Sequence, residues 1–286
     1  MLVEIAIGDA YGAGFEFCER PKIAQYNDLT AYQQHYLGMP AGSYTDDTQM
    51  SIAIAELLLD RLDWSPANIA DGFVRAFKRD KRLGYAKGLY QLLSDVADGA
   101  ALLAILRPDS SRNGAAMRSV PLGLVKDQQT MEQQCRVQAQ LTHNTPEGVV
   151  SAMAVAYASH YLVYQLGPVA QLTTFVSEKT KHAWRNDWDA EVECDGIQTV
   201  HAVMTVMSQH RSYAEILRHS VALGGDVDSV AAIALGLASL STAYQSDLPE
   251  HLYTGLEQGR YGMSYLRELD ARLSAQFGLP LLAGNS

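Results

Sequence analysis

The chain has 286 residues, of which 48% are hydrophobic and 19% are charged, and its 32 acidic and 22 basic side chains give a formal net charge of −10. This composition excludes an intrinsically disordered chain, because such chains have too few apolar side chains to form a core. The acidic balance also excludes a non-specific nucleic-acid binder and a polybasic membrane-binding surface, since both need a surplus of Lys and Arg.

The three cysteines, Cys18, Cys135 and Cys194, are widely spaced and form no CxxC pair. This pattern predicts reduced thiols rather than a disulfide framework or a zinc site, and therefore a cytoplasmic protein. The N-terminus lacks the basic start of a secretion signal, and Glu4 and Asp9 interrupt its apolar residues. No apolar stretch reaches the roughly 20 residues that a membrane span needs, so no transmembrane helix is expected.

Helical periodicity extends through most of the chain. Apolar side chains recur three or four residues apart in 50–58 and again in the Ala-rich segment 230–240, as on the buried face of a helix. The stretch 146–165 has few charges and many Ala, Val and Met residues, which predicts a helix that is buried on all sides. The other segments whose sequences suit a helix are 65–79, 85–98, 130–141, 197–209, 213–223 and 262–277.

Local signals support these helices. Ser65-Pro66 and Thr145-Pro146 each place a capping residue before a proline, a pattern that is typical of helix starts. No run of residues alternates as a strand would, and the chain contains no internal repeat and no linker rich in Gly, Ser or Pro. We therefore predict an all-α fold, a compact orthogonal array of ten or more helices in a single domain over residues 1–286.

Two acidic segments stand directly before apolar helices: SYTDDT at 43–48 and LGGDVDS at 223–229. Neighbouring carboxylates repel, so bringing them together costs free energy unless a cation or hydrogen-bond donors compensate. One interpretation is helix capping, because a helix start stabilises carboxylates. The other is a site for one or two Mg²⁺ or Mn²⁺ ions, because each segment offers two carboxylates and a hydroxyl as hard oxygen ligands.

Three further segments carry candidate chemistry. In GDAYGAGFE (8–16), small residues allow another helix to approach closely, and Glu16 follows a Gly-rich turn where a carboxylate can act as an acid or base. The alternative is an ordinary surface glutamate. The segment RNGAAMR (112–118) can offer backbone N–H groups to a phosphate. His143, at another helix start, suits either a cap or a site residue.

These segments, in this order, resemble the ADP-ribosylglycohydrolase family, which includes the dinitrogenase-reductase-activating glycohydrolases and ADP-ribosylhydrolases. The resemblance covers the chain from Gly8 to about Ala238, and TDDT and GGDVDS are its most specific parts. It implies an all-α domain whose cleft holds two divalent cations, Mg²⁺ or Mn²⁺. The implied metal ligands are Thr45, Asp46, Asp47, Asp226, Asp228 and Ser229.

The resemblance also implies which residues act on the substrate. Glu16 takes the position of the family's catalytic or substrate-positioning glutamate, and Asp47 is expected to contribute to catalysis. Three positions depart from the family pattern. Ser229 replaces the commoner threonine but keeps the hydroxyl. The segment 84–88 matches the usual Gly-rich loop only loosely, and the segment 194–197 lacks an aromatic residue that some members have. The implied substrate-binding residues are Gly84, Tyr85, Asn113, Gly114, Ala115 and His143.

The implied function is metal-dependent hydrolysis of the glycosidic bond between ADP-ribose and a modified target, either a protein side chain or a small molecule. One alternative is a non-catalytic ADP-ribose or nucleotide sensor of the same fold, and another is a structural protein whose carboxylates only cap helices. Because residues 45–47 and 226–229 would meet at one metal centre, a single domain is favoured. General nucleic-acid and membrane binding are not expected, and the sequence predicts no particular oligomeric state.

Overall fold

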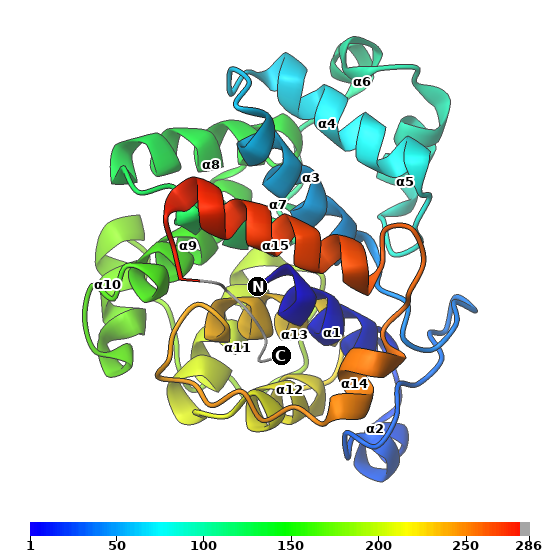
Figure 1. Cartoon of the computed structure of the whole chain (residues 1–286), viewed down its shortest axis with the longest axis vertical. Helices are drawn as coiled ribbons and strands as arrows, with labels where there is room; N and C mark the ends of the chain where they lie inside the picture. Colours follow the sequence, from blue (N-terminus) through cyan, green and yellow to red (C-terminus); the bar gives the residue numbers. More distant parts are fainter. Residues whose placement is uncertain (281–286) are drawn as a thin grey trace.

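Two helices at the centre of the molecule, α1 (Leu2–Ala13) and α13 (Val227–Ala238), pack against each other although the first lies at the N-terminus and the second in the last quarter of the chain (Figure 1). Every residue of both helices is buried. Small residues on α1 permit this close approach, as the sequence predicts. A Cβ atom at Gly8 would clash with the backbone of α13, and one at Gly12 would lie 2.5 Å from the Cα of Asp228. The second acidic segment is therefore held directly against α1.

The structure, a computed structural model, describes residues 1–280, and these residues form fifteen α-helices and no β-strand. The all-α prediction is confirmed. None of the helices in this part of the chain is long and apolar enough to cross a membrane. The elements other than α1 and α13 are α2 (Arg20–Tyr26), α3 (Asp46–Asp60), α4 (Pro66–Arg79), α5 (Lys87–Asp95), α6 (Gly99–Ile105), α7 (Gly114–Met117), α8 (Gln128–Thr142), α9 (Pro146–Val163), α10 (Leu172–Thr180), α11 (Gly196–Gln209), α12 (Tyr213–Ala222), α14 (Glu250–Gly255) and α15 (Met263–Phe277), with the short 3₁₀ helices η1 (Val120–Leu124) and η2 (Val169–Gln171).

The predicted helix starts and the predicted buried helix are confirmed. The Thr145 hydroxyl accepts a hydrogen bond from the Gly148 N–H at 3.1 Å at the start of α9, and the Ser65 hydroxyl caps α4 in the same way. All residues from 151 to 162 are buried, so α9 has no solvent-facing side over this stretch. Capping fixes where these helices begin, and their apolar faces fix them in the core.

The main difference from the prediction lies between residues 85 and 105. The segment 85–98 forms a shorter helix than predicted, α5, which ends at Asp95, and a further helix, α6, begins at Gly99. Asp98 fixes the start of α6, since its carboxylate accepts a hydrogen bond from the Ala101 N–H and caps that helix. The sequence did not predict α2, α6, α10 or α14, whose six to nine residues are too few to show a clear period.

A half-buried arginine anchors the loop between α4 and α5. Arg82 binds the carboxylate of Asp80 and that of Glu257, the latter at 2.5 Å, and its guanidinium lies 4.0 Å from the centre of the Tyr44 ring. These contacts tie the loop to the segment before α3 and to the C-terminal part of the chain. The loop thereby carries Gly84 to the first acidic segment.

Candidate active site

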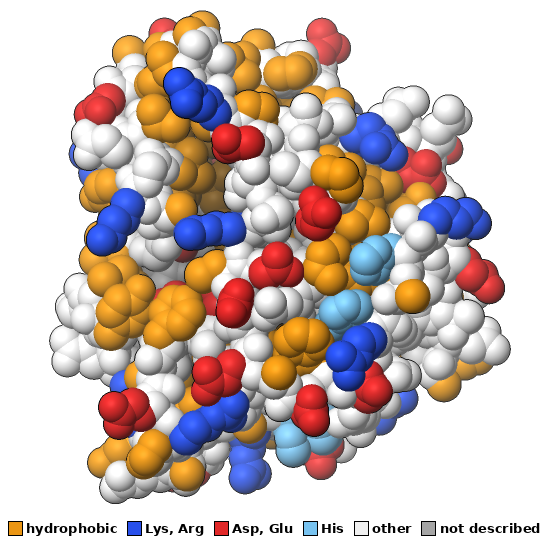
Figure 2. All heavy atoms as spheres, turned by 180° about the vertical axis from the view of Figure 1, so that it is seen from behind, with side chains coloured by type: hydrophobic (Ala, Val, Ile, Leu, Met, Phe, Trp, Pro, Cys, Tyr) orange, Lys and Arg blue, Asp and Glu red, His pale blue; other side chains and the backbone are white. Residues whose placement is uncertain are grey.

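A cavity of about 1010 Å³ opens where the turn after α1 meets the starts of α3 and α13, opposite α5 and α6. Figure 2 shows the face of the molecule with a hollow whose walls are largely apolar, bordered by acidic and basic side chains. The volume lies at the upper end of the range of about 300–1,000 Å³ that is usual for ligand pockets. The cavity can therefore hold a ligand the size of a dinucleotide.

The sequence-predicted site residues other than Thr45 and Ala115 line this cavity. Thr45 is fully buried beneath the wall. Ala115 lies in the core, where its carbonyl accepts a hydrogen bond from the Ser119 hydroxyl at 2.7 Å, so the structure places it behind the wall and not on it. The predicted residues that line the cavity are Glu16, Asp46, Asp47, Gly84, Tyr85, Asn113, Gly114, His143, Asp226, Asp228 and Ser229.

Asp9, which the sequence reasoning did not single out, holds the start of α3. Its buried carboxylate accepts hydrogen bonds from the N–H and hydroxyl of Thr45 at 3.0 and 2.8 Å, and from those of Thr48 at 2.9 and 2.6 Å. Four donors on one carboxylate fix the backbone of the first acidic segment. An acidic residue in the middle of an apolar helix is the signal in the sequence that could have indicated this role.

The second acidic segment depends on two glycines and an asparagine. Gly224 and Gly225 have φ values of +76° and +86°, a left-handed conformation that glycine adopts without steric cost. This turn brings Asp226 and Asp228 to the cavity at the start of α13. The side-chain amide of Asn113 donates a hydrogen bond to Asp226 at 2.6 Å, so Asn113 orients this carboxylate as well as lining the cavity.

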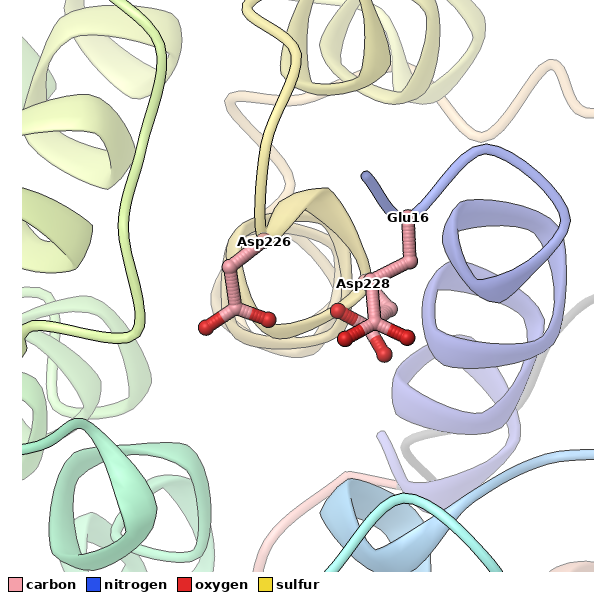
Figure 3. Close-up of side chains that lie close together, drawn as sticks. All are labelled: Glu16, Asp226 and Asp228. Atoms are coloured by element: carbon pink, nitrogen blue, oxygen red, sulfur yellow. The ribbon is translucent and has the colours of Figure 1, made fainter. Parts of the chain in front are cut away.

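Glu16 completes a group of three close carboxylates. Figure 3 shows Glu16 beside Asp228, with Asp226 across from them at the start of α13. One oxygen of each carboxylate lies within 4.8 Å of the others. The Phe17 N–H donates a hydrogen bond to the Gly225 carbonyl at 2.9 Å, which joins the turn after α1 to the second acidic segment. Residues distant in sequence thus meet at one point.

Burial raises the pKa of all five carboxyl groups at the cavity. For Asp46, Asp47 and Asp228 the pKa lies well above its ordinary value, because repulsion from neighbouring carboxylates adds to the effect of burial. For Glu16 a hydrogen bond with His35 partly offsets the rise in pKa. Without cations, the ionised group of carboxylates therefore lowers the stability of the fold at neutral pH.

The carboxylates fit hard divalent cations. Within residues 1–280, no Lys or Arg nitrogen lies within 4.0 Å of Asp46, Asp47, Asp226 or Asp228. The Oδ1 atom of Asp47 is buried and has no hydrogen-bond partner in this part of the chain, which is costly for a polar atom. Capping does not explain Asp226, whose side chain makes no capping bond to α13. Cations bound by oxygen ligands would supply the missing positive charge.

Two predicted substrate-binding residues have defined surroundings. Tyr85 lines the cavity, and its hydroxyl donates a hydrogen bond to the buried side chain of Gln49 at 2.7 Å. The imidazole of His143 contacts the Thr142 hydroxyl through Nδ1 at 2.6 Å, and burial lowers the pKa of His143 to about 3. His143 is therefore neutral at physiological pH. A Cβ atom at Gly114 would lie 2.9 Å from this ring, so only glycine fits there without displacing it.

Apolar side chains line part of the cavity wall. Away from the carboxylates, α5, α6 and the loop after α6 contribute the apolar side chains Leu89, Leu92, Ile105 and Leu106. Beside Glu16, the rings of Phe17 and Tyr36 are 52% and 60% exposed and lie edge to face, with their centroids 6.3 Å apart. The cavity wall thus combines a group of carboxylates with apolar side chains, and two exposed aromatic rings lie beside Glu16.

Replacing Gly84 with alanine is expected to disturb the first acidic segment. Gly84 has a φ of +106°, and a Cβ atom there would clash with Oδ1 of Asp46. We expect a loss of about 1–3 kcal/mol in the free energy of unfolding, and loss of any stabilisation by Mg²⁺ or Mn²⁺. Thermal unfolding with and without each cation measures both effects.

Gly88 provides a matched control in the same loop region, because a Cβ atom there meets nothing within 4 Å. Gly88 lies at the start of α5, so Gly88→Ala should keep or slightly raise the free energy of unfolding, since alanine favours a helix more than glycine does. Equal stability of Gly84→Ala and Gly88→Ala in thermal unfolding, with and without the cations, would contradict the close packing of Gly84 on Asp46.

Comparison with known protein families gives a match over residues 1–280 to the model of the family described as ADP-ribosylglycohydrolase. The chain belongs to the ADP-ribosylglycohydrolase family. The match includes both acidic segments, Glu16 and every wall of the cavity. It confirms the resemblance found in the sequence.

Two named relatives of this ADP-ribosylglycohydrolase are similar along most of their length. ADP-ribosyl-[dinitrogen reductase] glycohydrolase of Rhodospirillum rubrum is 25% identical over 281 residues, which cover 94% of this chain and 93% of the relative. ADP-ribosylarginine hydrolase Tri1 of Serratia proteamaculans is 25% identical over 270 residues, which cover 87% of this chain and 72% of the relative. A solved structure of an ADP-ribosylglycohydrolase-related protein complex has a TM-score of 0.68 at 22% identity, covering 97% of this chain and 95% of the other, and it shares the fold.

As an ADP-ribosylglycohydrolase, the protein is a hydrolase that cleaves glycosidic bonds of ADP-ribose and so removes ADP-ribose from its targets. The alternative of a non-catalytic sensor is not favoured.

Proposed function

We propose that this ADP-ribosylglycohydrolase is a metal-dependent enzyme that hydrolyses the bond between the ribose C1″ and a modified target. The observation that supports this most directly is the group of carboxylates on one cavity wall, where Oδ1 of Asp47 is buried without a hydrogen-bond partner in residues 1–280. Ionised carboxylates this close require compensating positive charge.

The two acidic segments are proposed to hold two divalent cations, Mg²⁺ or Mn²⁺. The Thr45 hydroxyl donates its proton to Asp9 and accepts a long hydrogen bond from the Asp47 N–H at 3.5 Å, which leaves one lone pair of its oxygen for a cation. When bound, such cations act as Lewis acids that hold ribose hydroxyls and orient a water molecule. The proposed ligands are Thr45, Asp46, Asp47, Asp226, Asp228 and Ser229.

Glu16 is proposed to move the proton in the reaction, or to position the ribose 2″-hydroxyl. It lines the cavity beside Asp226 and Asp228, and burial raises its pKa toward the range useful for proton transfer. Positive charge develops on the ribose as the glycosidic bond breaks, and nearby carboxylates stabilise that charge. Asp47 is proposed to help orient the attacking water.

The polarity of the cavity supports one orientation of ADP-ribose. The distal ribose would lie at the carboxylates, and the adenine would pack on the apolar side chains from α5 and α6. The neutral imidazole of His143 and the backbone at Gly114 are proposed to contact the pyrophosphate. Neutral His143 suits this role as a hydrogen-bond donor through Nε2.

The proposed target is an ADP-ribosylated protein side chain or a small ADP-ribosyl molecule. The named relatives support a protein target, since one is named for ADP-ribosylarginine and the other for ADP-ribosyl-dinitrogen reductase. We also propose a cytoplasmic location, supported by three free cysteines, and a single domain over residues 1–286, supported by the convergence of distant segments on one cavity.

The function is tested by removing metals with a chelator, restoring Mg²⁺ or Mn²⁺, and measuring free ADP-ribose released from a substrate panel. The panel contains ADP-ribosylarginine, an ADP-ribosylserine peptide and an ADP-ribosylated nucleobase. We expect metal-dependent release from at least one substrate. ADP-ribose at about 100 times its dissociation constant should add about 2.7 kcal/mol to the free energy of unfolding. Absence of both release and stabilisation would contradict the proposal.

A further inference from the structure

His35, in the loop between α2 and α3, is a buried partner of Glu16 that sequence reasoning missed. Only 4% of it is exposed. Its Nε2 atom lies 2.8 Å from Oε2 of Glu16, and its Nδ1 atom accepts a hydrogen bond from the Leu37 N–H at 2.9 Å. Both ring nitrogens are therefore engaged. Nothing in the local sequence indicates this pairing, because it depends on the path of the loop.

These two contacts fix the position of the imidazole proton. The Leu37 N–H can only donate, so Nδ1 of His35 must be the unprotonated nitrogen. The ring proton then resides on Nε2 and is donated to the Glu16 carboxylate. The other tautomer would place two donors together at Leu37 and two acceptors together at Glu16. The backbone therefore determines which nitrogen faces Glu16.

We propose that His35 is a positioning residue for Glu16, whose N–H holds Oε2 and so directs Oε1 into the cavity. This inference rests on the proposed function, in which Glu16 acts on the substrate. A glutamate has several rotatable bonds, and holding it in one conformation costs side-chain entropy unless a specific contact compensates. The Tyr36 ring stacks on the imidazole with centroids 4.5 Å apart and thereby helps to keep it in place.

Two substitutions of similar polarity separate the two contacts of His35. In His35→Asn, the amide oxygen can replace Nδ1 and accept from Leu37, but the side chain is too short to reach Glu16. In His35→Gln, the amide nitrogen can replace Nε2 and donate to Glu16. We expect His35→Asn to lower kcat about 10–100-fold, as is usual when the partner of a site residue is lost, with little change in KM or Mn²⁺ affinity. His35→Gln should recover most of kcat.

Nitrogen-15 NMR of the histidine rings provides a readout that does not depend on activity. The signals absent from the His35 variants identify His35 in the wild-type protein, and we expect protonated Nε2 and unprotonated Nδ1. Protonated Nδ1, wild-type kcat in His35→Asn, or equal loss of kcat in both variants would overturn the inference. If the wild-type protein releases no ADP-ribose from any substrate but shows the expected tautomer, the proposed function fails while the His35–Glu16 contact stands.

Discussion

Asp228→Asn is expected to abolish measurable metal-dependent release of ADP-ribose while making the metal-free protein more stable. The loss in kcat should be at least about 10²–10³-fold, as for removal of a single electrostatic stabiliser of a transition state. Stability should rise because burial and the nearby Glu16, Asp226 and Asp47 raise the pKa of Asp228, so its ionised form is disfavoured in the fold. A neutral amide removes that repulsion, and its oxygen can still accept from the Ser229 N–H.

Thermal unfolding in chelator and steady-state kinetics with Mg²⁺ test the two halves of this prediction. We expect the melting temperature in chelator to increase by roughly 2–4 °C for each kcal/mol of relieved repulsion. Asp127→Asn is the matched control, because Asp127 is an exposed cap of α8 and asparagine caps equally well. Full activity of Asp228→Asn in chelator would contradict the metal assignment.

Glu16→Gln is expected to lower kcat about 10²–10⁴-fold, the usual contribution of a general acid or base, while metal binding is kept. Glutamine preserves the size of the side chain and can still accept from Nε2 of His35, so the surrounding structure should hold. The glutamine amide, unlike the glutamate carboxylate, cannot take up a proton at the reacting bond. Kinetics and calorimetric titration with Mn²⁺ measure these effects on the same samples.

The control for Glu16→Gln is Glu19→Gln, three residues further along the chain. Glu19 is exposed and makes no side-chain capping bond to α2. The substitution Glu19→Gln should therefore leave both kcat and Mn²⁺ affinity unchanged. A large loss of Mn²⁺ affinity in Glu16→Gln would show instead that Glu16 is a metal ligand, a role that its closeness to Asp226 and Asp228 also permits.

The sequence predicts the all-α fold and the two acidic segments before α3 and α13 because their causes are local, whereas the other predicted residues of the cavity wall were implied by the family resemblance. Thr145 before Pro146 sets the start of α9, and the paired glycines before Asp226 set the turn into α13. Such signals depend on capping and on backbone conformation, which the nearest residues determine. The short helix α6 was missed for the complementary reason that two turns show no clear period.

The supporting contacts of the site could not be predicted because they are formed between distant segments. Asp9 accepts hydrogen bonds from four donors of Thr45 and Thr48 at the start of α3, and His35 reaches Glu16 from a loop without regular structure. Ala115 was expected at the cavity, but the orientation of the short helix α7 turns it into the core. These positions depend on how the helices pack, which no local pattern specifies.

The contact between α1 and α13 also has a consequence for the order of folding. The carboxylates of the site come from the first quarter of the chain and from a helix that begins at Val227, so they meet only when a very long loop closes. Closing such a loop is slow and entropically unfavourable until the helices pack. During synthesis, a ribosome-bound chain that lacks α13 would expose the apolar residues of α1. The candidate site is therefore complete only after α13 has been synthesised and has packed on α1.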